Sequence, residues 1–120
     1  LSQAVQRNGV TVAEMDGRVG GYACWGSIPG TLAAADLYWI VVHPELQGRK
    51  IGAALLQAAE EWIAEEGRGR VYVETSTRPQ YQPTRAFYAA CGYEPAAELA
   101  DFYAPGDGKA VLLKILGAEG

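Results

Sequence analysis

The sequence contains few of the residues that build metal centres and disulfide frameworks. It has two cysteines and one histidine among 120 residues, and Cys24 and Cys91 stand in apolar or aromatic surroundings without a metal or disulfide spacing. No run of about 18 apolar residues occurs, and the N-terminus lacks the charged-then-apolar pattern of a signal peptide. We therefore expect a cytoplasmic protein with no metal and no membrane partner. The chain starts at Leu1 rather than at methionine, which leaves room for residues upstream.

Basic residues are also few. The chain has 10 lysines and arginines against 14 aspartates and glutamates, for a formal net charge of −4. A general nucleic-acid binder normally carries a basic stripe that neutralises phosphates, so we expect no nucleic-acid partner. Any polyanionic ligand must then be held by a local site. With 49% hydrophobic residues, the length suits one globular domain over residues 1–120.

Hydrophobic periodicity divides the chain into strands and two helices. Asp16-Gly17 joins two extended segments as hairpin turns do, and a strand rich in aromatic and β-branched residues ends at His43-Pro44. From Ile51 to Gly67 the apolar residues recur at helical spacing, with Glu60 among the polar residues outside the apolar face. The predicted strands are residues 10–15, 18–27, 36–42, 70–76, 93–102 and 109–116, and the predicted helices are residues 51–66 and 83–90.

The order of these elements indicates the fold class. Strands follow one another both as hairpins and across helices, which predicts an α/β (α+β) fold with a mixed, mostly antiparallel central sheet flanked by helices. The segment Arg70–Ser76 alternates with period two, so Tyr72, Glu74 and Ser76 share one face of its strand.

The turn between the third strand and the first helix has the composition of an anion site. It reads Gln47-Gly48-Arg49-Lys50-Ile51-Gly52-Ala53. The first amides of a helix have no internal acceptor, and the helix dipole favours an anion there by about 0.3–1 kcal/mol. Gly48 and Gly52 have no side chain to keep phosphates from the backbone, and Arg49 and Lys50 add positive charge. On this turn alone, a pyrophosphate site and an ordinary solvated loop are equally good interpretations.

The common nucleotide motifs are absent, which disfavours nucleoside triphosphates and dinucleotides. The segment instead resembles the acetyl-CoA signature of the GNAT superfamily of N-acyltransferases, Gln/Arg-x-x-Gly-x-Gly/Ala after a strand that ends in Val-x-Pro. The matching residues are Val42-His43-Pro44 and Gln47-Gly48-Arg49-Lys50-Ile51-Gly52. Lys50 stands at the first glycine of the pattern, so the loop can use its backbone in the family's way only if residue 50 avoids a conformation that needs positive φ.

The resemblance covers residues 10–116 and implies the GNAT-like acyl-CoA N-acyltransferase fold without the family's first strand and first helices. It implies acetyl-CoA as the cosubstrate. Ile40, Val41 and Val42 would splay from the neighbouring strand and pair their backbone with the pantetheine arm. The amides of residues 47–53 would bind the pyrophosphate, and an amide at Val41 or Val42 would polarise the thioester carbonyl.

The resemblance also implies a general acid. The segment from Phe87 to Tyr93 is similar to the family's aromatic-Tyr-x-x-x-Gly-aromatic segment, whose tyrosine protonates the departing CoA thiolate, so Tyr88 takes that role. A phenol with a pKa of about 10 stays protonated at neutral pH and can donate to such a thiolate. The asparagine that the family often carries seven residues earlier is Tyr81 here, which leaves Thr84 or Arg85 to reach the cosubstrate.

The acceptor amine must lose a proton before it attacks. For a lysine-like amine at pH 7 this costs about 4–5 kcal/mol, so a base would help. Glu74 is the leading candidate because it lies mid-strand, beside the strand that should carry the thioester. Asp36 and Glu14 are alternatives, and a paired or solvated structural role remains open for each carboxylate.

These residues together predict an N-acetyltransferase that passes the acetyl group of acetyl-CoA directly to a primary amine of a small molecule or peptide. A non-catalytic acyl-CoA- or CoA-binding regulatory module is the alternative, and a phosphate-binding regulator unrelated to CoA ranks last. The presence of Tyr88 favours the enzyme. The final strands of this superfamily often meet across a dimer, so a homodimer is compatible with the resemblance.

Overall fold

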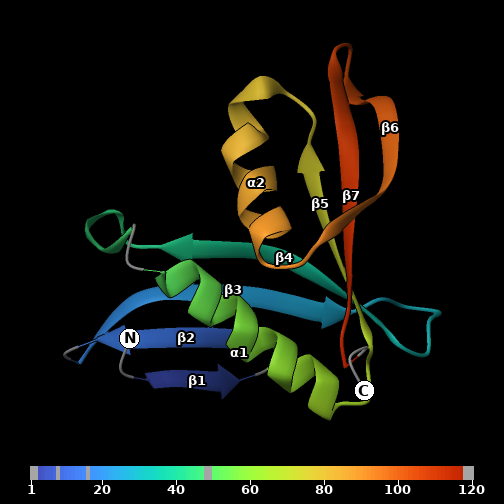
Figure 1. The fold of residues 1–120 in the computed structure, drawn as a ribbon. Coiled ribbons are helices and arrows are strands. Elements are labelled where there is room, and N and C mark those ends of the chain that lie inside the picture. Colours follow the sequence, from blue (N-terminus) through green and yellow to red (C-terminus); the bar gives the residue numbers. More distant parts are fainter. Residues whose placement is uncertain (1–2, 8, 16, 48–49, 118–120) are drawn as a thin grey trace.

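A computed structural model describes residues 3–7, 9–15, 17–47 and 50–117 (Figure 1). Two α-helices and seven strands are assigned within these ranges, with 3-10 turns at Pro44–Leu46 and Pro79–Tyr81. The elements are β1 (Gln3–Arg7), β2 (Val10–Met15), β3 (Arg18–Ser27), β4 (Ala34–Val42), α1 (Ile51–Glu65), β5 (Arg70–Ser76), α2 (Gln82–Ala90), β6 (Glu94–Ala104) and β7 (Asp107–Ile115).

The strands form one mixed sheet in the order β1-β2-β3-β4-β5-β7-β6. Only the β4–β5 pair is parallel among the described strands, and the other neighbours are antiparallel. The helix α1 lies across β1 to β4, and α2 lies beside β5 to β7 (Figure 1). The predicted fold class is therefore confirmed.

The structure adds one strand, β1, that the sequence analysis did not predict. It pairs along its whole length with β2, from Gln3 opposite Glu14 to Arg7 opposite Val10. Its five residues, QAVQR, show little hydrophobic alternation, so the sequence pattern does not predict a strand there. The strand is defined by its backbone ladder to β2. No helix precedes β2 within the described residues.

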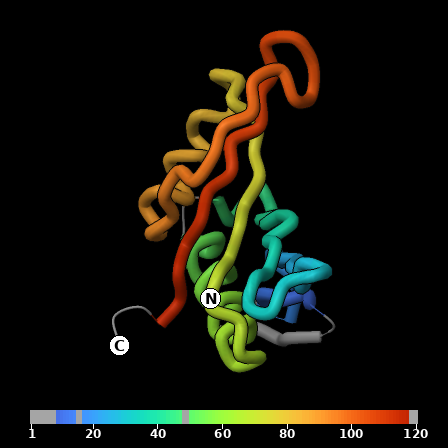
Figure 2. The backbone as a smooth tube through the Cα atoms, turned by 90° about the vertical axis from the view of Figure 1, so that its right-hand side faces the viewer, coloured from blue at the N-terminus to red at the C-terminus, as the bar shows by residue number. Residues whose placement is uncertain are grey.

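The sheet divides into two arms where β4 and β5 part: the first arm consists of β1 to β4 and the second of β5 to β7. Their parallel ladder joins only Ala34 to Leu37 of β4 with Arg70 to Val73 of β5. Beyond this point β4 continues along β3 and β5 continues along β7, and the two strands run off in different directions (Figures 1 and 2). The second half of β4 thus leaves one edge of its backbone without a neighbouring strand.

A β-bulge in β4 marks the place where the strands part. Cys24 of β3 lies opposite Trp39, but Trp25 lies opposite Leu37, so Tyr38 is an extra residue in β4. Ala35 and Leu37 face the core before the bulge, and Ile40 and Val42 pack against it afterwards. The bulge therefore reverses which side chains of β4 face the helix.

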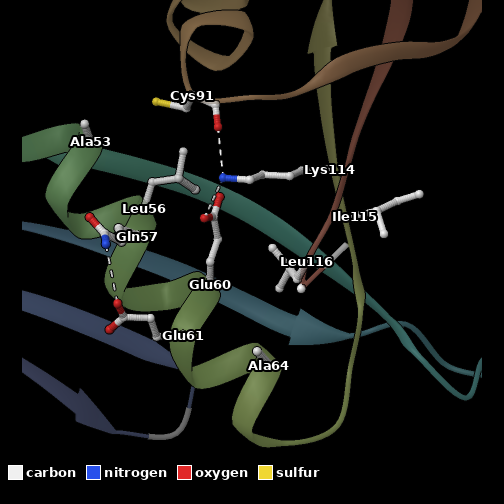
Figure 3. Close-up of a pocket in the computed structure, with 11 residues that line it drawn as sticks. Ala53, Leu56, Gln57, Glu60, Glu61, Ala64, Cys91, Lys114, Ile115 and Leu116 are labelled. Carbon is white, nitrogen blue, oxygen red and sulfur yellow. Dashed lines mark hydrogen bonds and ion pairs between the residues drawn. The ribbon is translucent and has the colours of Figure 1, made fainter. Parts of the chain in front are cut away.

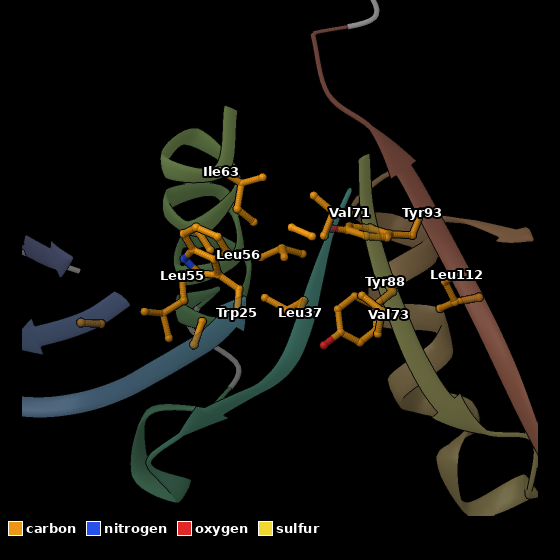
Figure 4. Close-up of a cluster of buried hydrophobic side chains, with 14 of the residues drawn as sticks. Trp25, Leu37, Leu55, Leu56, Ile63, Val71, Val73, Tyr88, Tyr93 and Leu112 are labelled. Atoms are coloured by element: carbon orange, nitrogen blue, oxygen red, sulfur yellow. The ribbon is translucent and has the colours of Figure 1, made fainter. Parts of the chain in front are cut away.

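One hydrophobic core runs beneath both arms (Figure 4). In the first arm, α1 buries Leu55, Leu56 and Ile63 against β2 to β4, and the rings of Trp25 and Trp62 meet edge to face at 5.2 Å. Leu55 and Ile63 lie on the face of α1 that was predicted from periodicity, and the burial of Leu56 was not predicted. In the second arm, Val71 and Val73 of β5 pack with residues of α2 and β7.

A buried ion pair joins α1 to the second arm (Figure 3). Glu60 was expected outside the apolar face of α1, but it is only 8% exposed. Its carboxylate accepts hydrogen bonds from the Tyr93 hydroxyl at 2.8 Å and from Lys114 Nζ at 2.9 Å, and Lys114 also donates to the carbonyl of Cys91 at 3.0 Å. These partners compensate the carboxylate for its lost hydration, which explains how it can be buried.

The groove around this ion pair, of about 490 Å³, runs along the flank of α1 (Figure 3). Its central polar groups already satisfy one another, so we assign no ligand to it. None of the helices among the described residues is long and apolar enough to cross a membrane.

The packing of α1 gives a stability prediction. Leu55→Ala removes a side chain that is fully buried, and it should lower the free energy of unfolding by about 2–5 kcal/mol. Leu32→Ala, at a side chain that is 98% exposed, is the matched control and should change it by less than about 0.5 kcal/mol. Urea denaturation measures both. Equal midpoints for the two variants would contradict the placement of α1 on the sheet.

Candidate active site

The parting of β4 and β5 opens a cleft of about 530 Å³ that passes through the sheet. On its helical side lie Tyr88 and Thr84 of α2. On the opposite side lies Glu74, because side chains alternate along β5 and Val73 and Thr75 are the buried ones. Both faces of the sheet therefore have access to one cavity. The remaining lining residues are Tyr38, Trp39, Ile40, Val73, Thr75, Ser76, Tyr81, Tyr103 and Asp107.

Tyr88 is held firmly at this cleft. Its side chain is 6% exposed and belongs to the core, with its ring centroid 5.1 Å from that of Phe87 and 5.5 Å from that of Tyr93. The hydroxyl points away from α2 toward β4 (Figure 4). Burial, with a smaller contribution from Cys91, raises the pKa of Tyr88 to about 12. The phenol therefore keeps its proton at neutral pH.

A second cavity, of about 620 Å³, lies at the N-terminus of α1. Gln47, Lys50, Ile51, Gly52 and Ala53 line it from the turn and the first helical residues. The carbonyl of Lys50 accepts the first helical hydrogen bond, from Ala54 at 3.1 Å, so the preceding amides have no acceptor within the helix. The facing wall consists of Phe87 and Ala90 of α2, the following residue Cys91, and Val42 and Leu46.

Lys50 contradicts the condition set by the sequence analysis. It precedes α1 in the left-handed conformation, with φ 63° and ψ 20°. Residue 50 thus adopts a backbone conformation that glycine would adopt more easily, and the Cβ of Lys50 makes this conformation strained. Two further predicted phosphate-binding residues, Gly48 and Arg49, lie outside the described residues.

The three predicted pantetheine residues, Ile40, Val41 and Val42, lie in the part of β4 beyond its ladder with β5. They pair with Ala23, Tyr22 and Gly21 of β3 on one side only. Ile40 lines the first cavity and Val42 the second. The predicted splaying of this strand is confirmed, and its open edge connects the two cavities.

The candidate base Glu74 is engaged by a lysine. Its carboxylate lies 3.1 Å from Lys109 Nζ of β7, with the Glu74 side chain 47% exposed. Asp36 of β4 lies on the same face of the sheet, as the Cα partner of Tyr72. Burial and the negative charge of Glu74 raise the pKa of Asp36, and Lys109 opposes this shift. Glu14 is on β2, three strands away from β5 in the sheet.

Other polar residues near the two cavities have structural partners. Arg85 donates to the backbone carbonyls of Ser76 and Arg78, which ties α2 to the end of β5. His43 accepts a hydrogen bond at Nδ1 from the amide of Glu45 at 3.1 Å and so caps the 3-10 turn. Thr84 lines the first cavity and remains available to a ligand.

The sequence analysis missed three aromatic residues of the cleft, Tyr38, Trp39 and Tyr103. The first two belong to a strand that was interpreted as buried. Regular alternation after Leu37 would turn Tyr38 outward but Trp39 inward, and the bulge is what turns Trp39 outward as well. Tyr103 stands near the tip of the β6–β7 hairpin. The adjacent aromatic pairs Tyr38-Trp39 and Phe102-Tyr103 are the signal that could have been read.

Comparison with known proteins agrees with this geometry. The sequence model described as the acetyltransferase (GNAT) domain matches residues 6–95. An uncharacterized N-acetyltransferase of Archaeoglobus fulgidus is 36% identical over 88 residues, which are 70% of this chain and 58% of that protein. The S-(2-succino)cysteine N-acetyltransferase of Bacillus subtilis is 28% identical over 98 residues, covering 78% of this chain and 59% of that protein.

Solved structures share the fold. A protein assigned to the GNAT acetyltransferases, from Desulfovibrio desulfuricans, superimposes with a TM-score of 0.87 at 37% identity, covering 88% of this chain and 68% of that one. An aminoglycoside 6'-N-acetyltransferase solved with coenzyme A has a TM-score of 0.75 at 18% identity, covering 88% of this chain and 71% of that one.

A mixed sheet whose strands part and whose two arms each carry a helix defines an N-acetyltransferase type of fold. The chain belongs to the GNAT acetyltransferase family. It spans 58% and 59% of the length of the two curated relatives that it matches.

The conformation of residue 50 gives a second prediction. Lys50→Gly should raise the free energy of unfolding by about 1 kcal/mol, because glycine adopts positive φ without the steric cost of a Cβ. Lys50→Ala removes the same charge but keeps the Cβ, so it should not stabilise the protein. Urea denaturation of both variants separates strain from charge. A stabilisation of similar size in both would refute the strained backbone.

Proposed function

We propose that this protein transfers the acetyl group of acetyl-CoA directly to a primary amine of a small molecule or peptide. One observation carries the proposal. The cleft between β4 and β5 brings a buried phenol on one face of the sheet and carboxylates on the other to a single cavity. A thioester placed there would have a proton donor on one side and an open path for an amine on the other.

The two cavities suit the two halves of acetyl-CoA. The pyrophosphate binds at the N-terminus of α1, where the amides of Lys50 to Ala53 and the helix dipole favour an anion. Gly48 and Arg49 contribute to the same turn in this proposal. The pantetheine arm runs along the open edge of β4 at Ile40, Val41 and Val42, where it pairs with the backbone as an added strand would. This places the thioester beside Tyr88.

Tyr88 is the general acid. When the amine attacks the carbonyl carbon, the carbon–sulfur bond breaks and the sulfur leaves as a thiolate. The Tyr88 hydroxyl donates its proton to that sulfur. With a pKa of about 12 the phenol remains protonated throughout the neutral and mildly alkaline range, so it can donate its proton over that whole range. An amide of Val41 or Val42 would polarise the thioester carbonyl.

The base is a carboxylate on the face opposite α2. Glu74, expected from the sequence, lines the cavity, but its carboxylate already has a cationic partner in Lys109. Burial and the nearby Glu74 raise the pKa of Asp36, which favours this carboxylate as a proton acceptor. We assign proton removal to this pair, with Asp36 as the immediate acceptor.

Isothermal titration tests the cosubstrate. Acetyl-CoA and CoA should bind with similar Kd, and ATP should bind at least about 10-fold more weakly, because it lacks the pantetheine arm that pairs with β4. Equal affinity for ATP and CoA would contradict the assignment of the β4 edge to the pantetheine arm. Absence of CoA binding would contradict the assignment of the turn before α1 to the pyrophosphate.

The general acid is tested by Tyr88→Phe in a thiol-release assay over a mixture of amine acceptors. The turnover number should fall by about 100-fold or more while the affinity for acetyl-CoA is kept. Tyr72→Phe, a phenol removed from the same arm but outside the cleft, is the matched control and should retain activity.

The pH profile adds an independent check. With its pKa at about 12, Tyr88 stays protonated up to about pH 10, so it should cause no fall in the turnover number between about pH 8 and about pH 10. Unchanged turnover in Tyr88→Phe would exclude the phenol as acid. Acetyl-CoA binding without thiol release from the wild type would favour the regulatory module.

A further inference from the structure

A third, smaller cavity of about 210 Å³ adjoins the catalytic cleft. It shares Tyr38, Trp39, Glu74 and Tyr103 with the cleft and adds Asp36 and Leu37. It therefore continues the cleft on the face of the sheet opposite α2, where Asp36 and Glu74 lie. An acceptor that enters from this face meets the thioester on the side away from Tyr88.

Three aromatic side chains form the walls of this cavity, and each is about half exposed. Tyr38, Trp39 and Tyr103 are 52%, 53% and 49% exposed, although rings of this size are usually better covered. The rings of Tyr38 and Trp39 lie 6.0 Å apart at an angle of 44°. Gly26 makes room for Tyr38, because a Cβ at residue 26 would lie 2.5 Å from the Tyr38 hydroxyl oxygen.

Among the described residues, Asp36 is the carboxylate at this cavity that forms no direct ion pair, although the charge of Lys109 also acts on it. Glu74 is neutralised by Lys109, whose Nζ also lies 4.4 Å from the ring centroid of Phe102. Asp107, farther along the cleft, is bound by Ser76 and lies 4.0 Å from Arg78. Asp36 has a raised pKa, as expected for a carboxyl that is partly desolvated and faces another carboxylate. A bound cation would relieve both effects.

We propose that this aromatic-walled cavity binds the protonated primary amine of a monocationic acceptor with an apolar stem, such as an alkylamine or arylalkylamine, with Asp36 as its counter-ion. The proposal rests on the proposed function and names its substrate class. The ammonium group lies at Asp36 while the apolar stem lies against the rings of Tyr38, Trp39 and Tyr103.

The same placement accounts for the protons. The ammonium gives one proton to the Asp36 carboxylate, and the neutral nitrogen then attacks the thioester carbon. The carbon–sulfur bond breaks, and the sulfur takes the Tyr88 proton. The amide nitrogen loses its second proton to solvent, from which Tyr88 is reprotonated, and Asp36 releases its proton to solvent. The net products are the amide, the free CoA thiol and one proton.

The cavity also excludes some acceptors. A free amino acid or an acidic amine would place its own carboxylate near Asp36 and Glu74, which like charges disfavour. A polyamine would have to bury a second ammonium group at a cavity whose other carboxylate, Glu74, already pairs with Lys109, so that the second charge would have no counter-ion. S-(2-succino)cysteine, named for the Bacillus subtilis relative, is therefore expected to be a poor acceptor here.

Direct binding tests the cation site without relying on turnover. In calorimetric titrations, phenethylamine should bind at least about 10-fold more tightly than 2-phenylethanol, which has the same apolar stem and no charge. Asp36→Asn should abolish this preference, and Trp39→Leu should weaken both ligands. Glu98→Gln removes a carboxylate from the exposed strand β6 and is the matched control, with wild-type binding expected.

Thiol release then tests the substrate class. The wild type should use phenethylamine with a kcat/KM at least about 10-fold above that for cadaverine or S-(2-succino)cysteine. Asp36→Asn should lose most of its kcat/KM for phenethylamine while it binds acetyl-CoA as the wild type does, which also shows that the variant is folded.

The outcomes separate the cation site from the proposed function. Equal binding of phenethylamine and 2-phenylethanol, or preferred use of S-(2-succino)cysteine, would overturn the cation site and leave the acetyltransferase standing. Binding of phenethylamine through Asp36 by a protein that does not bind acetyl-CoA would support the cation site and overturn the proposed function.

Discussion

The short parallel ladder between β4 and β5 is the constraint on which the rest of the structure depends. Four residues of each strand pair, and then each strand follows a different neighbour. Had the ladder continued, the two strands would have satisfied each other's backbone and closed the sheet. Because it stops, one strand edge is left open and a passage through the sheet appears. The core beneath the ladder keeps the two arms in place around that passage.

A passage through a sheet allows acid and base chemistry to be separated in space. The phenol belongs to the helical face, in the core, where burial keeps it protonated. The carboxylates belong to the other face, where Lys109 moderates their repulsion. A proton donor and a proton acceptor at the same side of a small cavity would neutralise each other by direct hydrogen bonding. Here the sheet itself stands between them, and only a molecule in the passage contacts both.

The sequence predicted local structure well and long-range contacts poorly. Alternation identified the faces of β5, and helical spacing identified the packed face of α1, because both signals lie within one segment. The burial of Glu60 could not be foreseen, because Tyr93 and Lys114 stand 33 and 54 residues away along the chain. The strand β1 owes its existence to a neighbour rather than to its own pattern. The role of Tyr88 was inferred from a family resemblance, and its position at the cleft agrees with that role without testing it.

The bulge at Tyr38 has a consequence for how this strand can change in evolution. Since the bulge adds one residue, odd-numbered side chains face the core before it and even-numbered ones face it afterwards. Deleting Tyr38 would remove the bulge and join Leu37 directly to Trp39, so that Ile40 and Val42 would still face α1 and Trp39 would still face outward. A strand that became regular without losing a residue would instead turn Trp39 and Val41 toward α1 and expose Ile40 and Val42. Any alignment with a homologue that has a regular strand needs a gap at this position before residues on the two sides can be compared.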